Sequence, residues 1–320
     1  MAHRIGLIGA GIMGRRMADR VAAHPRFVLA AAWDPDRAAL DRLLQAHSGA
    51  AAVGDARMLV AHDDVDCVYI ASPPASHASH AHAAFDRGKA VFCEKPLTVD
   101  DAEGEALVAR ADAERHKAGV NFSLATAPSF VRIAEAVASG TIGTIRRIDI
   151  RVRFARWPRG WQHGAAGWLT GAREGGFVRE VVSHFIFTTQ RLVGPLTVRS
   201  SKVERADPQR AERVVAAEMR AGDVAVMLDG AVEGGADDHN LWTVTGSSGV
   251  MRIRDWHGLE QEKGGKWSTV ESSSIDAMRQ RAGAAQLDHL AALLEGRANT
   301  LPTLREALDV QRTIEAILKG

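Results

Sequence analysis

The sequence predicts two domains: an α/β domain with a doubly wound parallel sheet, then an α+β domain with a large, mainly antiparallel open sheet. The 320 residues are enough for two cores of ordinary size. Residues 1–122 alternate short apolar runs with longer helical patterns, which is typical of βαβ units. Further on, residues 148–154 carry an apolar side chain at every second position, which indicates a strand with one buried face.

The first domain is predicted to span residues 1–122. Each of its apolar runs is short enough for a buried strand, and the longer segments between them have helical patterns. The predicted strands are 4–9, 28–34, 67–71, 90–93 and 120–122, and the predicted helices are 12–23, 37–47, 77–87 and 99–116.

The second domain is predicted to span residues 123–302, beginning with a helix at 128–139. Residues 246–249, Gly-Ser-Ser-Gly, form a turn between its last two predicted strands. We expect the final helix, 303–320, to pack back on the first domain. Its predicted strands are 148–154, 196–200, 214–220, 224–232, 241–245 and 250–254, and further helices cover 276–295 and 304–318.

Composition favours a small-molecule partner. The 40 Lys and Arg residues nearly cancel the 39 Asp and Glu residues, so no basic field is available for a nucleic acid. No apolar run is long enough for a signal peptide or a membrane span. Cys67 and Cys93 lie in apolar runs and are expected to be reduced core residues, so we expect a soluble, cytoplasmic protein.

Residues 9–14 form a Gly-x-Gly-x-x-Gly motif between the first strand and the first helix. Gly9 permits the tight turn, Gly11 lets a pyrophosphate approach the backbone, and Gly14 allows close packing of helix on strand. The N–H groups at Ile12 and Met13 favour an anion. In this context the motif predicts a Rossmann domain that binds a dinucleotide.

Two residues bear on the choice of dinucleotide. Asp34 ends the second predicted strand, where a carboxylate accepts the ribose hydroxyls of NAD and repels a 2′-phosphate. Arg37 stands three residues further on, where a guanidinium could bind that phosphate. We expect NAD, with NADP as the open alternative.

Three further segments carry a resemblance to the Gfo/Idh/MocA family of NAD(P)-dependent oxidoreductases. They are residues 70–77 (IASPPASH), 94–97 (EKPL) and 175–184 (GGFVREVVSH), and with the rest of the chain they extend the resemblance over nearly its whole length. The resemblance implies hydride transfer between a nicotinamide and a secondary alcohol or ketone of a sugar, polyol, inositol-like or other small cyclic substrate. It also implies that Ser72, Pro73, His77, Glu94 and Lys95 belong to the cofactor site.

Lys95 is the first candidate catalytic residue for hydride transfer. Removing hydride from a carbinol carbon also requires a base near its hydroxyl group and a positive charge on the developing alkoxide. Lys95 follows a predicted parallel strand at its carboxyl end, which is where open α/β sheets bind ligands. The alternative is a surface lysine paired to Glu94.

Glu180 and His184 are four residues apart in a predicted helix, which places both on one face. With the resemblance, His184 is the preferred proton acceptor and donor, Lys95 polarises the same oxygen, and Glu180 orients the imidazole. The roles of Lys95 and His184 could also be exchanged or shared as a relay. The alternative is a surface ion pair or a core histidine.

The sequence departs from the family pattern at four places. Glu180 replaces the usual Asp, Val182 replaces a Gly, and Pro74 replaces an Asn. Residues 123–125 are Ser-Leu-Ala where the family often has an Arg. Without that arginine, the substrate pocket is expected to be less polar. A less polar pocket favours a smaller or more apolar substrate over a heavily hydroxylated sugar acid.

The expected substrate-binding residues combine aromatic and polar groups, which suit the C–H face and the hydroxyls of a ring. A tryptophan-rich loop packed on the sheet and a helix-surface arginine are the simpler alternatives. His77, His80 and His82 do not form a metal triad, and no metal is expected. The substrate candidates are Asn121, Trp161, Gln162, His163 and Arg179.

Two other functions stay open. The resemblance also admits redox-neutral, NAD-dependent glycoside cleavage, and a non-catalytic NAD-binding sensor is the second alternative. Charged residues alternate along residues 147–153, so the other face of this sheet is either solvated or covered by a second copy of the chain. We expect a homodimer or homotetramer through the C-terminal sheet.

Overall fold

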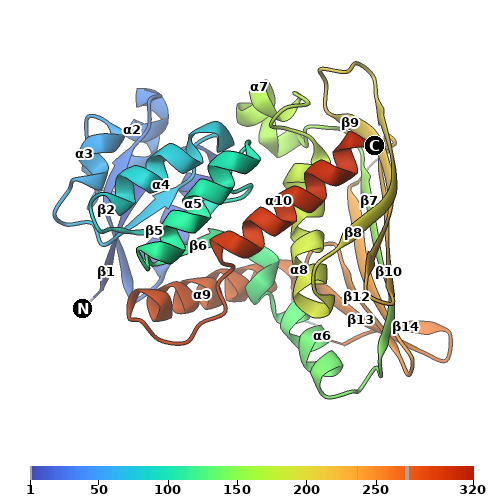
Figure 1. Cartoon of the computed structure of the whole chain (residues 1–320). Helices are drawn as coiled ribbons and strands as arrows, with labels where there is room; N and C mark the ends of the chain where they lie inside the picture. Colours follow the sequence, from blue (N-terminus) through green and yellow to red (C-terminus); the bar gives the residue numbers. More distant parts are fainter. Residues whose placement is uncertain (1, 236, 271–273) are drawn as a thin grey trace. The chain divides into compact units, whose positions relative to one another are not determined.

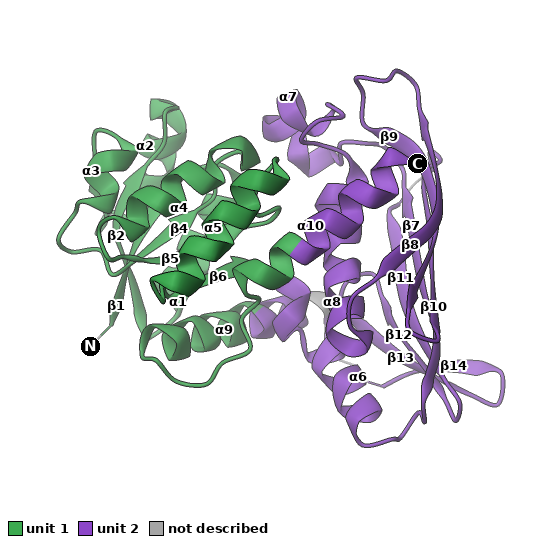
Figure 2. Cartoon of the chain, in the orientation of Figure 1, with its two compact units in different colours: residues 1–122, 283–308 green, residues 123–282, 309–320 purple. Residues whose placement is uncertain are grey.

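The structure is a computed structural model that describes residues 2–235, 237–270 and 274–320. It divides into two compact units (Figure 2). The first comprises residues 1–122 and 283–308, and the second comprises residues 123–282 and 309–320. Among the described residues, no helix is long and apolar enough to cross a membrane.

The first unit contains a parallel sheet with the strand order β3-β2-β1-β4-β5-β6. This order reverses direction at β1 and β4, which confirms the predicted doubly wound fold. Both faces of β4 and β5 are buried, as expected for a parallel sheet covered on both sides. The strands are β1 (His3–Ile8), β2 (Phe27–Trp33), β3 (Ala51–Ala52), β4 (Cys67–Ile70), β5 (Ala90–Glu94) and β6 (Ala118–Asn121).

Aspartates begin several helices of this unit. Asp36, Asp55 and Asp100 each accept a hydrogen bond from a backbone N–H of the first turn, which satisfies a donor that the helix leaves unpaired. Figure 1 shows α4 and α5 side by side, in contact with each other. β3 and α3 were not predicted, because both are too short to show a periodicity. The helices are α1 (Ile12–Ala23), α2 (Arg37–Ala46), α3 (Ala56–Val60), α4 (His77–Phe85), α5 (Asp101–Ala113) and the short η1 (Pro74–Ser76).

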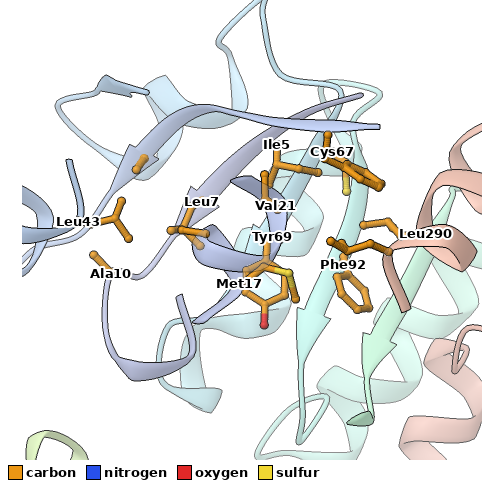
Figure 3. Close-up of a cluster of buried hydrophobic side chains, with 14 of the residues drawn as sticks. Ile5, Leu7, Ala10, Met17, Val21, Leu43, Cys67, Tyr69, Phe92 and Leu290 are labelled. Carbon is orange, nitrogen blue, oxygen red and sulfur yellow. The ribbon is translucent and has the colours of Figure 1, made fainter. Parts of the chain in front are cut away.

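The core of this unit joins the parallel sheet to α9 (Ile275–Leu294). Figure 3 shows Tyr69 and Phe92, from adjacent strands, and Leu290 from α9 in one cluster. Each such side chain contributes about 1.5–3 kcal/mol when it is removed from water. Residues 283–302, which we had assigned to the second domain, therefore belong to the first unit, because their apolar side chains complete its core.

The second unit contains a mainly antiparallel sheet with the order β14-β13-β12-β11-β7-β10-β9-β8, in which β7 and β10 pair in parallel. Alternate residues of β7 and β9 are buried, as predicted for a sheet with one covered face. β13 and β14 were not predicted, because their polar residues lack that alternation. The strands are β7 (Ile145–Phe154), β8 (Thr197–Arg205), β9 (Glu212–Ala221), β10 (Val224–Val232), β11 (His239–Gly246), β12 (Val250–Arg254), β13 (Gly258–Lys263) and β14 (Lys266–Thr269).

Helices pack against this sheet, and Figure 1 shows α6 and α8 beside it. Trp242 of β11 is fully buried and donates its indole N–H to Thr189 Oγ1 of α8 at 2.9 Å. Residues 309–320, which include most of the final helix, also belong to this unit. Within it, Thr313 Oγ1 accepts a hydrogen bond from Gln190. Only the start of the final helix therefore lies with the first unit. The helical segments are η2 (Ser123–Thr126), α6 (Pro128–Ala138), η3 (Gly160–Ala165), α7 (Ala166–Leu169), η4 (Val178–Val182), α8 (Ser183–Val193) and α10 (Leu304–Lys319).

A buried carboxylate holds the chain where η4 begins. Glu212 of β9 is 1% exposed, and its Oε1 accepts the backbone N–H of Val178 at 2.7 Å. Gly176 (φ +97°) lies so close that a Cβ there would meet Glu212 Oε2 at 2.2 Å. Burial raises the pKa of Glu212, although its hydrogen bonds and nearby arginines oppose that shift. The Gly-Gly segment thus passes tightly over a carboxyl group that is costly to ionise.

We predict that the substitution Glu212→Gln raises the free energy of unfolding more at pH 8 than at pH 4.5. A carboxyl group with a raised pKa in the folded state contributes stability below its unfolded pKa and loses it as the pH rises through the folded value. Glutamine keeps the acceptor for Val178 and cannot ionise. Urea unfolding at both pH values measures the effect, with Glu218→Gln, at an exposed position of the same strand, as the control. An equal effect of Glu212→Gln at the two pH values would contradict the assignment.

Candidate active site

The turn from β1 to α1 has the geometry that the glycine motif predicts. Gly9 has a φ of +97°, and a Cβ there would lie 2.6 Å from the backbone of Ala71. A Cβ on Gly14 would lie 1.8 Å from the carbonyl oxygen of Gly9. Neither position accepts a side chain, so α1 starts directly against the end of β1.

The space beside Gly11 is open. Apart from Gly11 and its two chain neighbours, no described residue has an atom within 4 Å of a Cβ built at Gly11. Gly11 also forms the N-cap of α1, which has no side-chain cap and no acidic residue in its first turn. Ile12 and Met13, both half-buried, begin the helix there. An uncapped helix N-terminus with room in front of it suits the pyrophosphate of a dinucleotide.

Asp34 is held firmly at the end of β2. Its Oδ2 accepts the N–H of Ala10 at 2.6 Å, and its Oδ1 accepts the N–H of Asp36 at 2.7 Å. These bonds fix a carboxylate beside the glycine turn, where a ribose is expected. Arg37 forms an ion pair with Asp41 at 2.9 Å, and its side chain is 72% exposed on α2.

His77 connects two turns of the first unit. Its ring is 1% exposed, with Nδ1 2.8 Å from the carbonyl oxygen of Pro96 and Nε2 2.9 Å from that of Ser72. Burial lowers the pKa of His77, although its contacts with the two carbonyl oxygens oppose that shift. Ser72 Oγ also bonds Ser76 Oγ at 2.7 Å, in the turn that contains Pro73. We had assigned His77 to the cofactor, but its buried ring instead holds the turn after β4 against the turn after Lys95.

The residue before Lys95 is anchored in a buried polar network. Glu94 is 6% exposed, and its Oε1 accepts bonds from the Tyr69 hydroxyl and from Asn121 Nδ2, the latter at 2.7 Å. Asn121 Oδ1 in turn accepts a bond from Gln286 Nε2 at 2.7 Å. Lys95, joined to Pro96 by a cis peptide bond, is half-buried and stands where β5 ends. The backbone on both sides of Lys95 is therefore held, by Glu94 before it and by the bond from Pro96 to His77 after it.

This network changes the role of Asn121. The sequence predicts a substrate-binding role for Asn121, but the residue is 2% exposed and each polar atom of its side chain bonds a buried neighbour. Gln286 was missed, because it lies 165 residues from Asn121 in the chain, in a helix whose other buried side chains are apolar.

In the second unit, Glu180 and His184 lie on either side of a change in helix geometry. Residues Val178–Val182 form a π-helical turn, and the α-helix begins at Ser183. Our prediction of one continuous α-helix was therefore wrong over the first turn. His184 is 7% exposed, and its ring stands nearly perpendicular to that of Trp256, with centroids 5.4 Å apart. π-helical turns are frequent at functional sites.

The remaining substrate candidates differ in their surroundings. Trp161 is 47% exposed, and the Arg159 guanidinium lies 4.7 Å from its ring centroid. Gln162 is buried, with Oε1 bonded to Arg159 N at 3.2 Å, whereas His163 is exposed.

Arg179 is engaged within its own unit. It binds Glu315 through Nε and Nη2 at 2.7 and 2.9 Å, and its Nη1 donates to the carbonyl oxygens of Ala172 and Gly175. We had suggested a clamp for a substrate carboxylate, but these contacts give Arg179 a structural role in place of it.

In the described part of the chain, no group of three or more His, Cys, Asp or Glu side chains could hold a metal ion. His80 packs edge-on against Trp33, and His82 lies 3.4 Å from Arg110 Nη1.

Comparison with known proteins identifies the class and then the family. Residues 3–122 match the family described as "Oxidoreductase family, NAD-binding Rossmann fold", and residues 130–252 match "GFO/IDH/MocA C-terminal domain". The first description gives the class of the protein, which is that of oxidoreductases with an NAD-binding Rossmann fold. The protein belongs to the Gfo/Idh/MocA family, as its motifs predicted.

Several curated relatives are named inositol dehydrogenases. Inositol 2-dehydrogenase 4 of Saccharopolyspora erythraea is 32% identical over 162 residues, which are 49% of this chain and 47% of that protein. Inositol 2-dehydrogenase of Rhizobium meliloti is 28% identical over 203 residues, or 63% and 58% of the two chains. The matched region thus spans about half the length of these relatives.

Solved structures share the fold at low identity. GenD2 from gentamicin A biosynthesis, in complex with NAD, has a TM-score of 0.83 at 22% identity, covering 99% of this chain and 93% of that one. An oxidoreductase from Agrobacterium radiobacter, in complex with NAD⁺, L-tartaric acid and magnesium, has a TM-score of 0.85 at 17% identity, covering 100% and 96%.

The network around Glu94 can be tested through Tyr69, the only tyrosine of the chain. Burial, and then the adjacent Glu94, raise the pKa of Tyr69 well above 10.0. A tyrosine with a raised pKa loses its stabilising contribution as the pH rises past its unfolded value, so ionisation should accompany unfolding. We expect no tyrosinate absorbance from the folded protein at pH 10.0, and about half ionisation of the urea-unfolded chain.

The control is Tyr69→Phe, which removes the absorbance and should cost about 1 kcal/mol of unfolding free energy through the lost hydrogen bond. A tyrosinate band at pH 10 in protein with a native circular dichroism spectrum would contradict the buried contact.

Proposed function

We propose that the protein is an NAD-dependent dehydrogenase that oxidises or reduces a secondary alcohol or ketone of a sugar, polyol, inositol-like or other small cyclic substrate. The observation that carries this proposal is the double anchoring of Lys95. The buried Glu94 precedes it, and the carbonyl oxygen of Pro96, held by His77, follows it. The names of the inositol dehydrogenase relatives support the substrate class.

The glycine turn and Asp34 would hold the cofactor. Gly11 leaves space for the pyrophosphate, and the N-terminus of α1 supplies backbone N–H groups. Asp34, fixed by Ala10 and Asp36, would accept the ribose hydroxyls and repel a 2′-phosphate. When bound, NAD supplies a nicotinamide ring that takes or gives a hydride.

Lys95 and His184 would handle the proton. The ammonium group of Lys95 stabilises negative charge on the substrate oxygen. The imidazole of His184 accepts the hydroxyl proton during oxidation and returns it during reduction. Glu180, in the π-helical turn that precedes the α-helix of His184, would orient the imidazole or bind a substrate hydroxyl.

The catalytic assignment predicts the behaviour of two variants. Lys95→Met and His184→Gln should each lower kcat by ~10²-fold or more, because each removes a group that acts on the proton or the oxygen. The dissociation constant for NAD⁺ should stay within about threefold in His184→Gln, since His184 lies outside the predicted cofactor residues. The assay follows reduced nicotinamide absorbance over sugars, polyols and cyclic alcohols, including myo-inositol.

The outcomes of this assay separate the proposed function from its rivals. Consumption of a glycoside without net NADH would favour redox-neutral cleavage. Tight NAD⁺ binding with no conversion of any compound would favour a sensor.

The cofactor assignment predicts a shift in preference for Asp34→Asn. Asparagine keeps an acceptor for the turn but removes the negative charge, so the preference for NAD⁺ over NADP⁺ should fall by ~10-fold or more, about 1.4 kcal/mol. Calorimetry with both cofactors measures this ratio. Arg37→Ala is the control, and because Arg37 pairs with Asp41 it should leave the ratio nearly unchanged. An unchanged ratio in Asp34→Asn would refute the role of the carboxylate.

We also propose that the protein is cytoplasmic and that the charged face of the second sheet meets another copy. Both cysteines are unpaired thiols in the core, and burial raises the pKa of Cys67 to about 12, which suits a reducing compartment.

On the sheet, Asp229 pairs with Arg151 and Arg153, so that charges of both signs alternate there. Sedimentation velocity at micromolar concentration should show a dimer or tetramer, and a monomer alone would refute the assembly.

A further inference from the structure

The turn between β12 and β13 contains two consecutive residues in the left-handed region of backbone space. Asp255 has a φ of +48° and Trp256 a φ of +74°. Among residues with a side chain, asparagine and aspartate enter this region most readily, and a large aromatic residue such as Trp256 is among the least suited to it. Such strain persists only where surrounding contacts impose it, and it concentrates at functional sites.

Asn240 imposes the conformation. It is 4% exposed, and it makes hydrogen bonds to both strained residues. Its carbonyl oxygen accepts the N–H of Asp255 at 2.9 Å, and its Oδ1 accepts the N–H of Trp256 at 3.0 Å. In return, Asp255 Oδ1 accepts the N–H of Asn240 at 3.1 Å. One buried residue of β11 therefore holds the turn in its unfavourable shape, through its backbone at Asp255 and through its side chain at Trp256.

The strained turn brings an indole onto His184. The ring of Trp256 meets the imidazole at 81°, with centroids 5.4 Å apart, and it stacks on Phe185 at 5.6 Å and 30°. Trp256 is half-buried, whereas His184 and Phe185 are buried. A glycine would form this three-residue connection at lower cost. The chain instead has Trp256 here, and its large ring reaches the imidazole of His184. The strained backbone therefore makes this contact between the two rings possible.

We propose that Trp256 is a positioning residue: it restricts rotation of the His184 imidazole and keeps the ring in the orientation needed for proton transfer. This inference rests on the proposed function, because it assumes that His184 moves the proton. When the base rotates out of the orientation needed for proton transfer, the rate of the chemical step falls more than the affinity for the substrate does. Trp256 therefore acts on kcat through His184.

The test compares Trp256→Leu and Trp256→Phe with Trp267→Leu. Leucine removes the ring, phenylalanine keeps an aromatic contact, and Trp267 is a partly exposed residue of β14 that packs on Arg252. The first readout is the ¹Hε1 resonance of His184 in histidine-labelled protein, assigned with His184→Gln. The ring current of Trp256 should displace this resonance in the wild type and in Trp267→Leu, only partly in Trp256→Phe, and not in Trp256→Leu.

The second readout is turnover of NAD⁺ with myo-inositol or with the best compound of the panel. Trp256→Leu should lower kcat by ~10-fold or more with KM within about threefold, and Trp256→Phe should recover most of the rate. A His184 resonance that is unchanged in Trp256→Leu, or a full kcat in that variant, overturns the proposal. If Trp256→Leu does not fold, a loss of rate in Trp256→Phe as large as in His184→Gln also overturns it. If the wild type converts no compound, the proposed function fails, and the resonance alone decides whether Trp256 orders the ring.

Discussion

The first unit depends on the contact between Gly14 and the carbonyl oxygen of Gly9. A single methyl group at Gly14 would lie 1.8 Å from that oxygen, so α1 can start where it does only because both residues lack side chains. This approach places the helix N-terminus at the edge of the sheet where the strand order reverses, between β1 and β4. The cofactor turn is therefore a consequence of packing, and the open space at Gly11 follows from it.

A second constraint is the carboxylate of Glu94. A charge buried in a parallel sheet needs partners, because leaving it without hydrogen bonds would be very costly. Tyr69 from β4 and Asn121 from β6 supply them, and Gln286 from α9 satisfies Asn121 in turn. The segment that returns to the first unit after the second sheet thus completes a polar network next to Lys95. The position of Lys95 therefore depends on contacts between residues that lie far apart in the sequence and share no sequence pattern.

The sequence was informative wherever structure is local. The range 12–23 of the first helix, the glycine turn and the alternation of buried residues in β7 follow from periodicities and turn chemistry that act over a few residues. Other features depend on distant partners. Arg179 and Asn121 looked like ligand-binding residues beside known motifs, but their partners lie 136 and 165 residues away. Glu212 and Trp256 were missed for the same reason, since neither carries a motif.

The central claim is that a hydride moves between a substrate carbinol carbon and a nicotinamide held by the first unit. The most direct measurement incubates the protein with NAD⁺ and a polyol, such as myo-inositol, deuterated at its carbinol carbons, and determines the mass of the recovered cofactor. The account predicts one deuterium on the nicotinamide ring of the reduced cofactor, and none with Lys95→Met or His184→Gln. If the wild type binds NAD⁺ but transfers no deuterium from any deuterated sugar, polyol or cyclic alcohol, the claim is contradicted.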